Sequence, residues 1–232
     1  KIKECVDGLI PYLSRDQLII LRSTVYPGTS EWLFKYLSKK KHCHVAFCHE
    51  RVVQGHTFDE IKNLPQIIAA SSKKAEKLAS NIFTKISKKL IFCSLQEAEF
   101  SKLFSNAFRY IQFAAANEFY MMTDKAGLNF NKIRKLTKDG YPRAQALPSS
   151  GFAAGPCLLK DTMQLLSYSR NNFSLGNSSM LVNEGLVLYL IDKIEKKYDL
   201  KKITVGLLGM SFKAECDDTR SSLSYKMKKF LM

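Results

Sequence analysis

Residues 17–29 read Gln-Leu-Ile-Ile-Leu-Arg-Ser-Thr-Val-Tyr-Pro-Gly-Thr, and this stretch decides the fold class. The apolar, β-branched run at 17–21 is typical of a buried strand. The Pro-Gly pair at 27–28 predicts a turn, and the Thr and Ser that follow can cap a helix that continues into Glu-Trp-Leu-Phe at 31–34. A strand that leads through a tight turn into a helix predicts an α/β protein.

The same alternation of strands and helices continues on the C-terminal side of this unit. We expect strands at 44–48, 66–70 and 89–93, and a helix at 73–87. Strands that alternate with helices predict a parallel sheet. The first element already lies at 6–11 and no glycine-rich phosphate turn precedes it, so we expect the chain to enter a Rossmann-like sheet partway through.

The middle of the chain predicts helices. No proline or glycine interrupts residues 97–125, where apolar side chains recur with a helical period, so one long helix is expected. Shorter helices are expected at 130–138, from about 160, at 178–198 and at 221–231, and a strand at 202–209. The predicted domains are the back part of a Rossmann-like domain at 1–94, a helical domain at 95–200, and the start of a second Rossmann-like domain at 201–232.

The composition of the chain argues against nucleic acid, metal ions and membranes as binding partners. The net charge is +15, but the lysines are scattered and do not interleave with aromatic residues, so a solvated surface is favoured over a nucleic-acid partner. The six cysteines form no Cys-x-x-Cys pair, which predicts no metal site and a reducing, cytoplasmic location. The apolar stretches are too short to span a bilayer, and no membrane partner is expected.

Five separated segments carry a resemblance. They read Ser-Thr-Val-Tyr-Pro-Gly-Thr at 23–29, His-Glu-Arg-Val-Val-Gln-Gly at 49–55, Glu-Phe-Ser-Lys-Leu-Phe-Ser-Asn at 99–106, Gly-Phe-Ala-Ala-Gly-Pro-Cys-Leu-Leu-Lys-Asp at 151–161, and Leu-Gly-Met-Ser-Phe-Lys with Asp-Asp-Thr-Arg at 208–213 and 217–220. In this order they resemble the UDP-glucose/GDP-mannose dehydrogenase family, and the second segment resembles its N-acetylmannosamine branch.

The resemblance implies an NAD-dependent enzyme that oxidises the C6 hydroxyl of a UDP-sugar to a carboxylate. It implies a homodimer through the long helix at 108–119. The family's opening Gly-x-Gly-x-x-Gly turn and its distal domain are absent, so we expect an internal, inactive segment of a longer enzyme. The Ala-Ala pair at 153–154, where the family has Gly-Gly, and Gln54, where one branch has a carboxylate, leave the sugar open.

Catalytic residues can be assigned on the same resemblance. A cysteine just before a helix, next to a lysine, is favoured as a thiolate by the helix dipole and the cation, so Cys157 is the expected nucleophile. Lys102 and Asn106 stand four residues apart on one helix face and could stabilise an oxyanion. Asp161 and Glu50 resemble the family's acid-base carboxylates.

The resemblance also implies ligand-binding positions. Contacts with NAD are expected from Ser23, Thr24, Lys160 and Arg220. Contacts with the sugar nucleotide are expected from Arg51, Arg143, Phe152, Phe212 and Lys213, with Arg143 reaching the neighbouring subunit. Two alternatives stay open: a catalytically silent dimerisation or binding module on the same scaffold, and a relative of the 3-hydroxyacid dehydrogenases, which share the architecture but use no cysteine.

Overall fold

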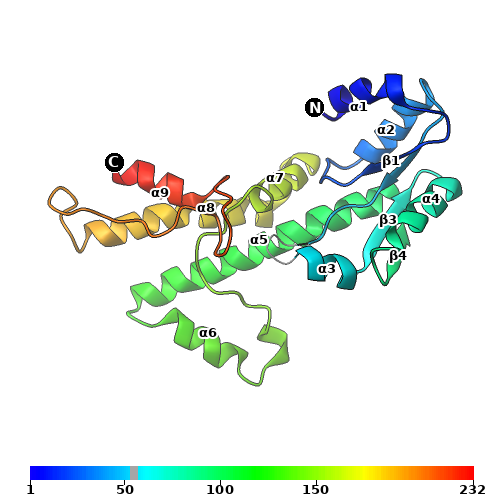
Figure 1. Cartoon of the computed structure of the whole chain (residues 1–232). Coiled ribbons are helices and arrows are strands. Elements are labelled where there is room, and N and C mark those ends of the chain that lie inside the picture. Colours follow the sequence, from blue (N-terminus) through cyan, green and yellow to red (C-terminus); the bar gives the residue numbers. More distant parts are fainter. Residues whose placement is uncertain (53–56) are drawn as a thin grey trace. The chain divides into compact units, whose positions relative to one another are not determined.

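The computed structural model describes residues 1–52 and 57–232 of the chain (Figure 1). Contacts divide the chain into two compact units, 1–104 and 105–232. The long helix α5 (Leu95–Lys125) begins in the first unit and continues in the second. The domain boundaries expected near 94 and 200 remain predictions.

The first unit is built around a four-stranded sheet with the order β1 (Leu18–Leu21), β2 (His44–Phe47), β3 (Gln66–Ala70) and β4 (Leu90–Cys93). The α/β fold class is therefore confirmed. The prediction of a fully parallel sheet is wrong for one pair of strands: β2 and β3 pair antiparallel, while the other two pairs are parallel. A parallel pair needs a connection that crosses the sheet, whereas the chain after β2 runs through the short helix α3 (Thr57–Asn63) and turns back.

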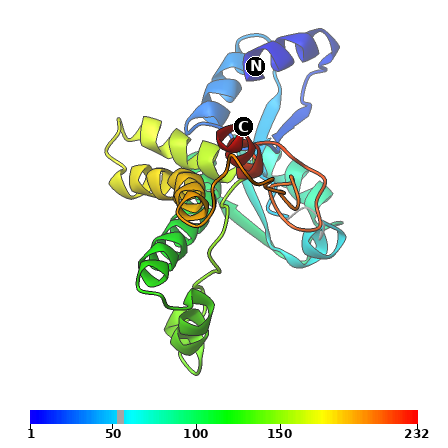
Figure 2. The ribbon, with the colours of Figure 1, turned by 90° about the vertical axis from the view of Figure 1, so that its left-hand side faces the viewer.

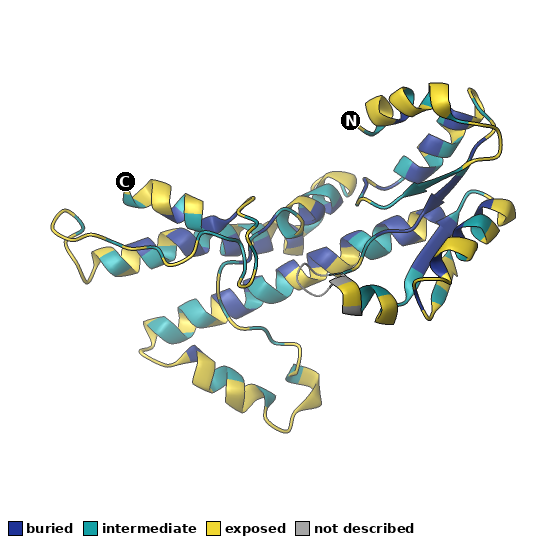
Figure 3. Cartoon of the chain, viewed as in Figure 1, coloured by how far each residue is buried: buried dark blue, intermediate teal, exposed yellow. Residues whose placement is uncertain are grey.

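Helices cover both faces of this sheet, as the alternation of side chains along β2 requires. Val45 and Phe47 point to the face that is covered by α1 (Ile2–Leu9), α2 (Thr29–Ser38) and the start of α5. Ala46 points to the opposite face, where α4 (Lys73–Phe83) packs. A short 3-10 helix (Ile10–Tyr12) follows α1. Buried residues concentrate on β2 and β3 and recur along α5 (Figure 3).

The N-terminus of α2 is capped by a side chain from α5. Gly28, with φ of +90°, precedes the helix, and no side chain of its own neighbourhood caps it. Instead the buried carboxylate of Glu99 accepts hydrogen bonds from the backbone N–H groups of Gly28, at 2.6 Å, and Ser30, at 2.7 Å. Because the first amides of a helix have no partner within the helix, this carboxylate replaces the missing cap.

The second unit is helical. After α5 the chain forms α6 (Phe130–Lys138), a 3-10 helix (Pro142–Ala144), α7 (Leu158–Tyr168), α8 (Ser174–Glu195) and α9 (Leu223–Leu231). The helices α7 and α8 lie side by side, and α9 packs on α8 (Figures 1 and 2). Apolar residues of α8 and α9 form the core between them: Val187, Ile191, Leu223 and Met227.

The strand expected at 202–209 does not form. The residues between α8 and α9 are irregular, and Ile203 and Leu208 are exposed. A strand needs a neighbour that pairs its backbone groups, and the described residues of this unit contain no other strand. The helix expected after it is confirmed as α9.

The cap on α2 yields a stability prediction. Replacing Glu99 with alanine should lower the free energy of unfolding by roughly 2 to 6 kcal/mol, because the Gly28 and Ser30 amides lose their acceptor and each such loss is worth about 1 to 3 kcal/mol. Urea unfolding monitored by circular dichroism measures the change. Glu118→Ala, at an exposed position of the same helix, is the control and should change stability little. Equal stabilities of the two variants would contradict the cap.

Candidate active site

The turn between β1 and α2 carries the first two predicted contacts. Ser23 is exposed and Thr24 half-buried, directly after the carboxyl end of β1, while Val25 turns into the core. Open α/β sheets bind ligands outside the carboxyl ends of their strands, so both hydroxyls stand where a cofactor can reach them. At the start of the helix that follows, two backbone amides are already taken, since Glu99 accepts from Gly28 and Ser30.

Glu50 follows β2 and is held by three donors. Its Oε1 accepts from the backbone N–H groups of Arg51, at 2.7 Å, and Val52, at 3.0 Å, and its Oε2 pairs with the guanidinium of Arg22. Burial raises the pKa of this carboxyl, but the two amides and the guanidinium outweigh it, and the pKa is lowered. Glu50 is therefore held as a carboxylate. The rest of its motif, 53–55, lies outside the described residues.

Arg22 is a residue that sequence reasoning missed. Its Nη1 donates to the Cys48 carbonyl, at 2.8 Å, and to the Gln66 side chain, at 2.9 Å, and its guanidinium lies 5.2 Å from the centre of the Phe83 ring. These contacts fix the cation that pairs with Glu50. An arginine at the end of β1 was visible in the sequence, but its partner lies 28 residues away, so no local pattern indicated the pair.

Two further predicted residues lie near Glu50 in the first unit. Arg51 is exposed and its Nη1 reaches the Pro65 carbonyl at 3.3 Å. Lys102, on α5, is half-buried. Burial, followed by the positive charges of Lys102, Arg51 and Arg22, lowers the pKa of His49 to about 4. His49 is therefore neutral at pH 7 and adds no positive charge beside Glu50.

Cys157 stands at the exposed N-terminus of α7, as the N-cap residue. Its carbonyl accepts the first hydrogen bond of the helix, from the Asp161 N–H at 2.9 Å. No described side chain caps this N-terminus through a hydrogen bond to it. The thiol is thus placed where free helix amides and the helix dipole favour negative charge.

Asp161 and Asn106 meet within the second unit. Asp161 is fully buried, and its Oδ2 accepts from the Asn106 amide at 2.5 Å. Its other oxygen, Oδ1, lies 2.9 Å from the Lys160 ammonium, although no donor is aligned to hydrogen-bond it. A buried carboxylate needs such partners. The structure therefore brings together three of the predicted residues next to Cys157. Lys102 belongs to the other unit, so a cleft shared by all of them remains a prediction.

The residues around 212–220 pack against the cysteine segment. Gly155 has φ of +105°, and a Cβ there would lie 2.8 Å from the Phe212 ring. The Gly155 N–H donates to the Ser221 carbonyl at 3.4 Å. Arg220 donates four hydrogen bonds to the Asp218 carboxylate, one from its backbone N–H and three from its side chain, and the side-chain bonds raise the pKa of the guanidinium. Arg220 is also close enough to Cys157 for an electrostatic interaction. The predicted residues Phe212, Arg220 and Cys157 thus belong to one region.

The remaining predicted residues have different surroundings. Phe152 packs against the apolar core of α8 and α9. Lys213 is half-buried. Arg143 lies in the exposed 3-10 helix, where its Nε donates to the Tyr141 hydroxyl at 2.8 Å and its guanidinium stacks on that ring. An exposed arginine supported in this way is available to a ligand or to another molecule.

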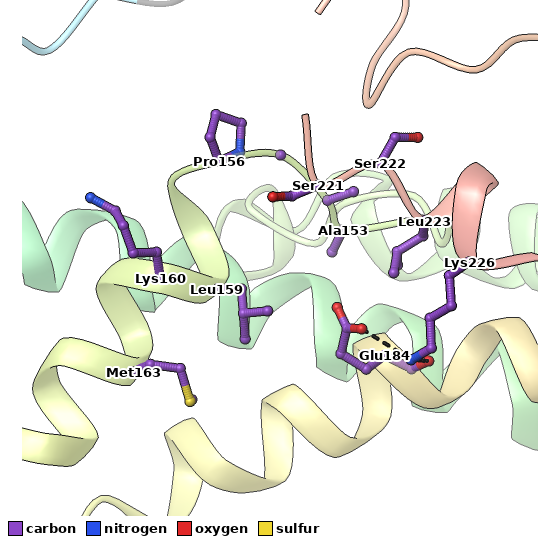
Figure 4. A pocket seen from close by; sticks show the side chains of 12 residues that line it. Ala153, Pro156, Leu159, Lys160, Met163, Glu184, Ser221, Ser222, Leu223 and Lys226 are labelled. Atoms are coloured by element: carbon purple, nitrogen blue, oxygen red, sulfur yellow. Dashed lines mark hydrogen bonds and ion pairs between the residues drawn. The ribbon is translucent and has the colours of Figure 1, made fainter. Parts of the chain in front are cut away.

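A pocket of about 450 Å³ adjoins the cysteine segment (Figure 4). The segment from Ala153 to Pro156, together with Lys160, lines one part of it. Glu184 of α8 and Lys226 of α9 line another part and form an ion pair with Oε2 and Nζ 3.0 Å apart. Sequence reasoning missed this pair, because 42 residues separate its members. The lining is mostly apolar, and Lys160 with the Glu184–Lys226 ion pair adds charge to it next to the predicted nucleophile.

Within residues 1–52 and 57–232, no three His, Cys, Asp or Glu side chains are grouped so as to hold a metal ion. No helix of the described chain combines the length and the apolar character that crossing a bilayer requires.

Known proteins resemble the chain over most of its length. UDP-N-acetyl-D-mannosamine dehydrogenase of Methanocaldococcus jannaschii is 31% identical over 229 residues, which are 97% of this chain and 53% of that protein. NDP-N-acetyl-D-galactosaminuronic acid dehydrogenase of Ralstonia nicotianae is 27% identical and matches 95% of this chain and 56% of its own length. The chain spans about half the length of these curated relatives.

Solved structures and family models agree with these relatives. The structure of UDP-D-ManNAc dehydrogenase from Pyrococcus horikoshii superposes with a TM-score of 0.91 at 28% identity, over 99% of this chain and 58% of that one. Residues 1–87 match the NAD binding domain of the UDP-glucose/GDP-mannose dehydrogenase family, and residues 96–184 match the central domain of the same family. Two models of one family thus match most of the chain, which belongs to the UDP-glucose/GDP-mannose dehydrogenase family.

Proposed function

We propose that the chain is the part of an NAD-dependent nucleotide-sugar 6-dehydrogenase that supplies the catalytic cysteine. The observation that carries the proposal is the placement of Cys157 at the exposed start of α7, beside Asp161 with its Asn106 and Lys160 partners. The substrate class is a UDP-linked hexose or N-acetylhexosamine. Relatives named for N-acetylmannosamine and for N-acetylgalactosaminuronic acid support the N-acetylhexosamine within that class.

The proposed reaction oxidises the C6 alcohol to a carboxylate in two steps. Loss of a hydride and a proton from the alcohol gives the aldehyde. The Cys157 thiolate then adds to the aldehyde carbon, and the resulting thiohemiacetal loses a second hydride to become a thioester. Water releases the acid and restores the thiol. The balance is one alcohol, one water and two NAD⁺ converted to one carboxylate, two NADH and three protons.

The residues of this chain fit contacts with NAD, which supplies the hydride acceptor when bound. Ser23 and Thr24 offer hydroxyls at the carboxyl end of β1, and Lys160 is half-exposed beside Cys157. Arg220 adds a cation in the same unit as the thiol. The amides at the start of α2 are occupied by Glu99, so we assign this turn to hydroxyl contacts and not to the pyrophosphate.

The two carboxylates are suited to different tasks. Asp161 is buried and held by the Asn106 amide, which suits it to orient groups around the thiol. Glu50 is partly exposed, and Arg22 and two backbone amides keep it deprotonated, the form that can accept a proton from the water that hydrolyses the thioester. Lys102 and Asn106 are proposed to stabilise the oxyanion that forms during addition and hydrolysis.

We further propose a homodimer through the second-unit part of α5. Large apolar side chains remain exposed on this helix, among them Phe108 at 62%, Phe119 at 46% and Met122 at 57%. With half-buried Ile111 and Ala115 they recur at intervals of three and four residues, which places them on one stripe. A stripe of this kind on a long helix is suited to pack against its own copy.

The nucleophile is tested with Cys157→Ser in the full-length natural protein. Oxidation of a UDP-N-acetylhexosamine to the acid should fall by roughly a hundredfold or more, because an alcohol is a poorer nucleophile and leaving group than a thiol at neutral pH. The measurement is NADH formation together with mass spectrometry of the product. Cys5→Ser, at another exposed cysteine, should retain full activity. Undiminished acid formation by Cys157→Ser would assign Cys157 to packing alone.

The dimer is tested with Ala115→Glu. A carboxylate in the middle of the stripe would be buried between two copies without a partner, so sedimentation velocity should show a shift from dimer to monomer. Ala126→Glu, in the exposed turn after α5, should remain a dimer. A wild-type protein that sediments as a monomer at high concentration would rule out this interface.

The role of Arg22 is tested by the pH dependence of Glu50. Because the folded pKa of Glu50 is lowered, the ion pair adds stability above the unfolded pKa and loses it as pH falls through the folded pKa. Arg22→Gln should raise the pKa of Glu50 in carboxyl ¹³C NMR titration and move the acidic limb of the rate of acid formation to higher pH. Arg15→Gln, an exposed control in the same unit, should move neither. An unshifted titration in Arg22→Gln would refute the ion pair.

A further inference from the structure

Two asparagines of α5 reach toward the two ends of the cysteine segment. Asn106 and Asn117 are eleven positions apart (117 − 106), which is about three helical turns, so both side chains lie on nearly the same side of the helix. Both are buried. Asn106 holds Asp161, in the first turn of α7 after Cys157. Asn117 holds Gly151, which begins the segment before Cys157.

The contact between Asn117 and Gly151 is bidentate. The Gly151 N–H donates to Asn117 Oδ1 at 2.8 Å, and Asn117 Nδ2 donates to the Gly151 carbonyl at 3.0 Å. Gly151 is exposed and lies in neither a helix nor a strand, and its backbone has no other hydrogen bond to the described residues. A single side chain therefore satisfies both backbone groups of this residue and sets the position of the chain there.

A second asparagine fixes the orientation of the first. Asn117 Nδ2 also donates to Asn183 Oδ1, at 2.9 Å, and Asn183 Nδ2 donates to the Tyr110 carbonyl on α5, at 3.0 Å. Asn117 and Asn183 are fully buried. The Asn117 side chain makes three hydrogen bonds, two to Gly151 and one to Asn183, and each has a defined donor and acceptor. The Asn117 amide therefore cannot rotate by 180° without breaking all three. Asn183, on α8, thus preorganises the two hydrogen bonds between Asn117 and Gly151, which we call the Gly151 clamp.

The segment between Gly151 and Cys157 leaves little freedom to absorb a displacement. Ala153 is buried, and Gly155 lies against the Phe212 ring with its N–H on the Ser221 carbonyl. A shift at Gly151 is therefore transmitted toward Cys157. We propose that Asn117 is a positioning residue for Cys157: it fixes the start of the cysteine segment, as Asn106 fixes the helix turn that follows.

The measurement of turnover rests on the proposed function, whereas the rate of Cys157 alkylation and the hydrogen exchange of the Gly151 amide do not. The variants are Asn117→Ala, which removes the clamp, and Asn117→Asp, which keeps an acceptor for the Gly151 N–H but loses both donated bonds. Asn177→Ala, at an exposed asparagine of α8, is the matched control. Each is made in the full-length natural protein and assayed at a temperature where circular dichroism shows it fully folded.

The first measurement is the rate of Cys157 alkylation by iodoacetamide, resolved by peptide mass spectrometry. Asn117→Ala should change this rate by about threefold or more, Asn117→Asp by less, and Asn177→Ala should match the wild type. The turnover number with a UDP-N-acetylhexosamine should fall about tenfold to a hundredfold in Asn117→Ala, while the KM for NAD stays within about twofold, as expected for a displaced nucleophile. A purely structural asparagine would lower the melting temperature and leave both rates unchanged in the folded variant, and that result would overturn the proposal.

The second measurement needs no variant. In the wild-type protein the Gly151 amide should be protected from hydrogen exchange although its residue is exposed and outside secondary structure. Exchange at the rate of an open loop amide would refute the clamp, and this holds even if Asn117→Ala fails to fold. A protein that shows the protected amide and the altered alkylation rate, but oxidises no UDP-sugar, would retain the clamp and lose the proposed function.

Discussion

A polar side chain buried in a helix must find hydrogen-bond partners, and on α5 this constraint organises distant parts of the chain. The Glu99 carboxylate accepts hydrogen bonds from amides at the start of α2. The Asn106 amide donates to Asp161, and the Asn117 amide bonds both backbone groups of Gly151. Each of these side chains is buried, and each partner belongs to a segment far away in sequence. The long helix therefore determines where a turn after β1 and both ends of the cysteine segment lie within their units.

The contrast between the two proposed acid-base carboxylates also follows from their hydrogen-bond partners. Glu50 lies at the end of a strand, where free backbone amides and Arg22 favour its charged form. Asp161 lies in the first turn of α7 and is fully buried, and its partners are side chains: the Asn106 amide and the Lys160 ammonium. Glu50 therefore stays partly accessible to solvent, whereas Asp161 is enclosed by its side-chain partners.

Much of the fold could be predicted from local patterns. The uninterrupted apolar period at 97–125 indicated α5, and the strand-turn-helix at 17–29 indicated β1 and α2, because propensity and turn chemistry act over a few residues. The antiparallel β3 and the missing strand at 202–209 were not predictable in this way. Strand direction depends on how a connection closes, and a strand exists only if another one pairs with it.

In the candidate site, too, local features could be predicted from the sequence and long-range contacts could not. Motif positions such as Cys157 and Asp161 could be named from the order of the segments. Their supports could not, because Arg22 and Glu50 are 28 residues apart, Asn117 and Gly151 are 34 apart, and Glu184 and Lys226 are 42 apart. Such pairs follow from tertiary packing, and a single sequence carries no signal for them.

The contact between Gly155 and Phe212 has a consequence for how the sequence can vary in evolution. Gly155 is constrained twice, by its positive φ and by the ring that occupies the space of a Cβ. A smaller residue at 212 would remove the second constraint but not the first. A substitution of Gly155 can therefore not be compensated at 212 alone, because the positive φ would still disfavour any side chain at 155. At this contact the positive φ of Gly155 limits which residues the sequence can carry, whatever side chain stands at 212.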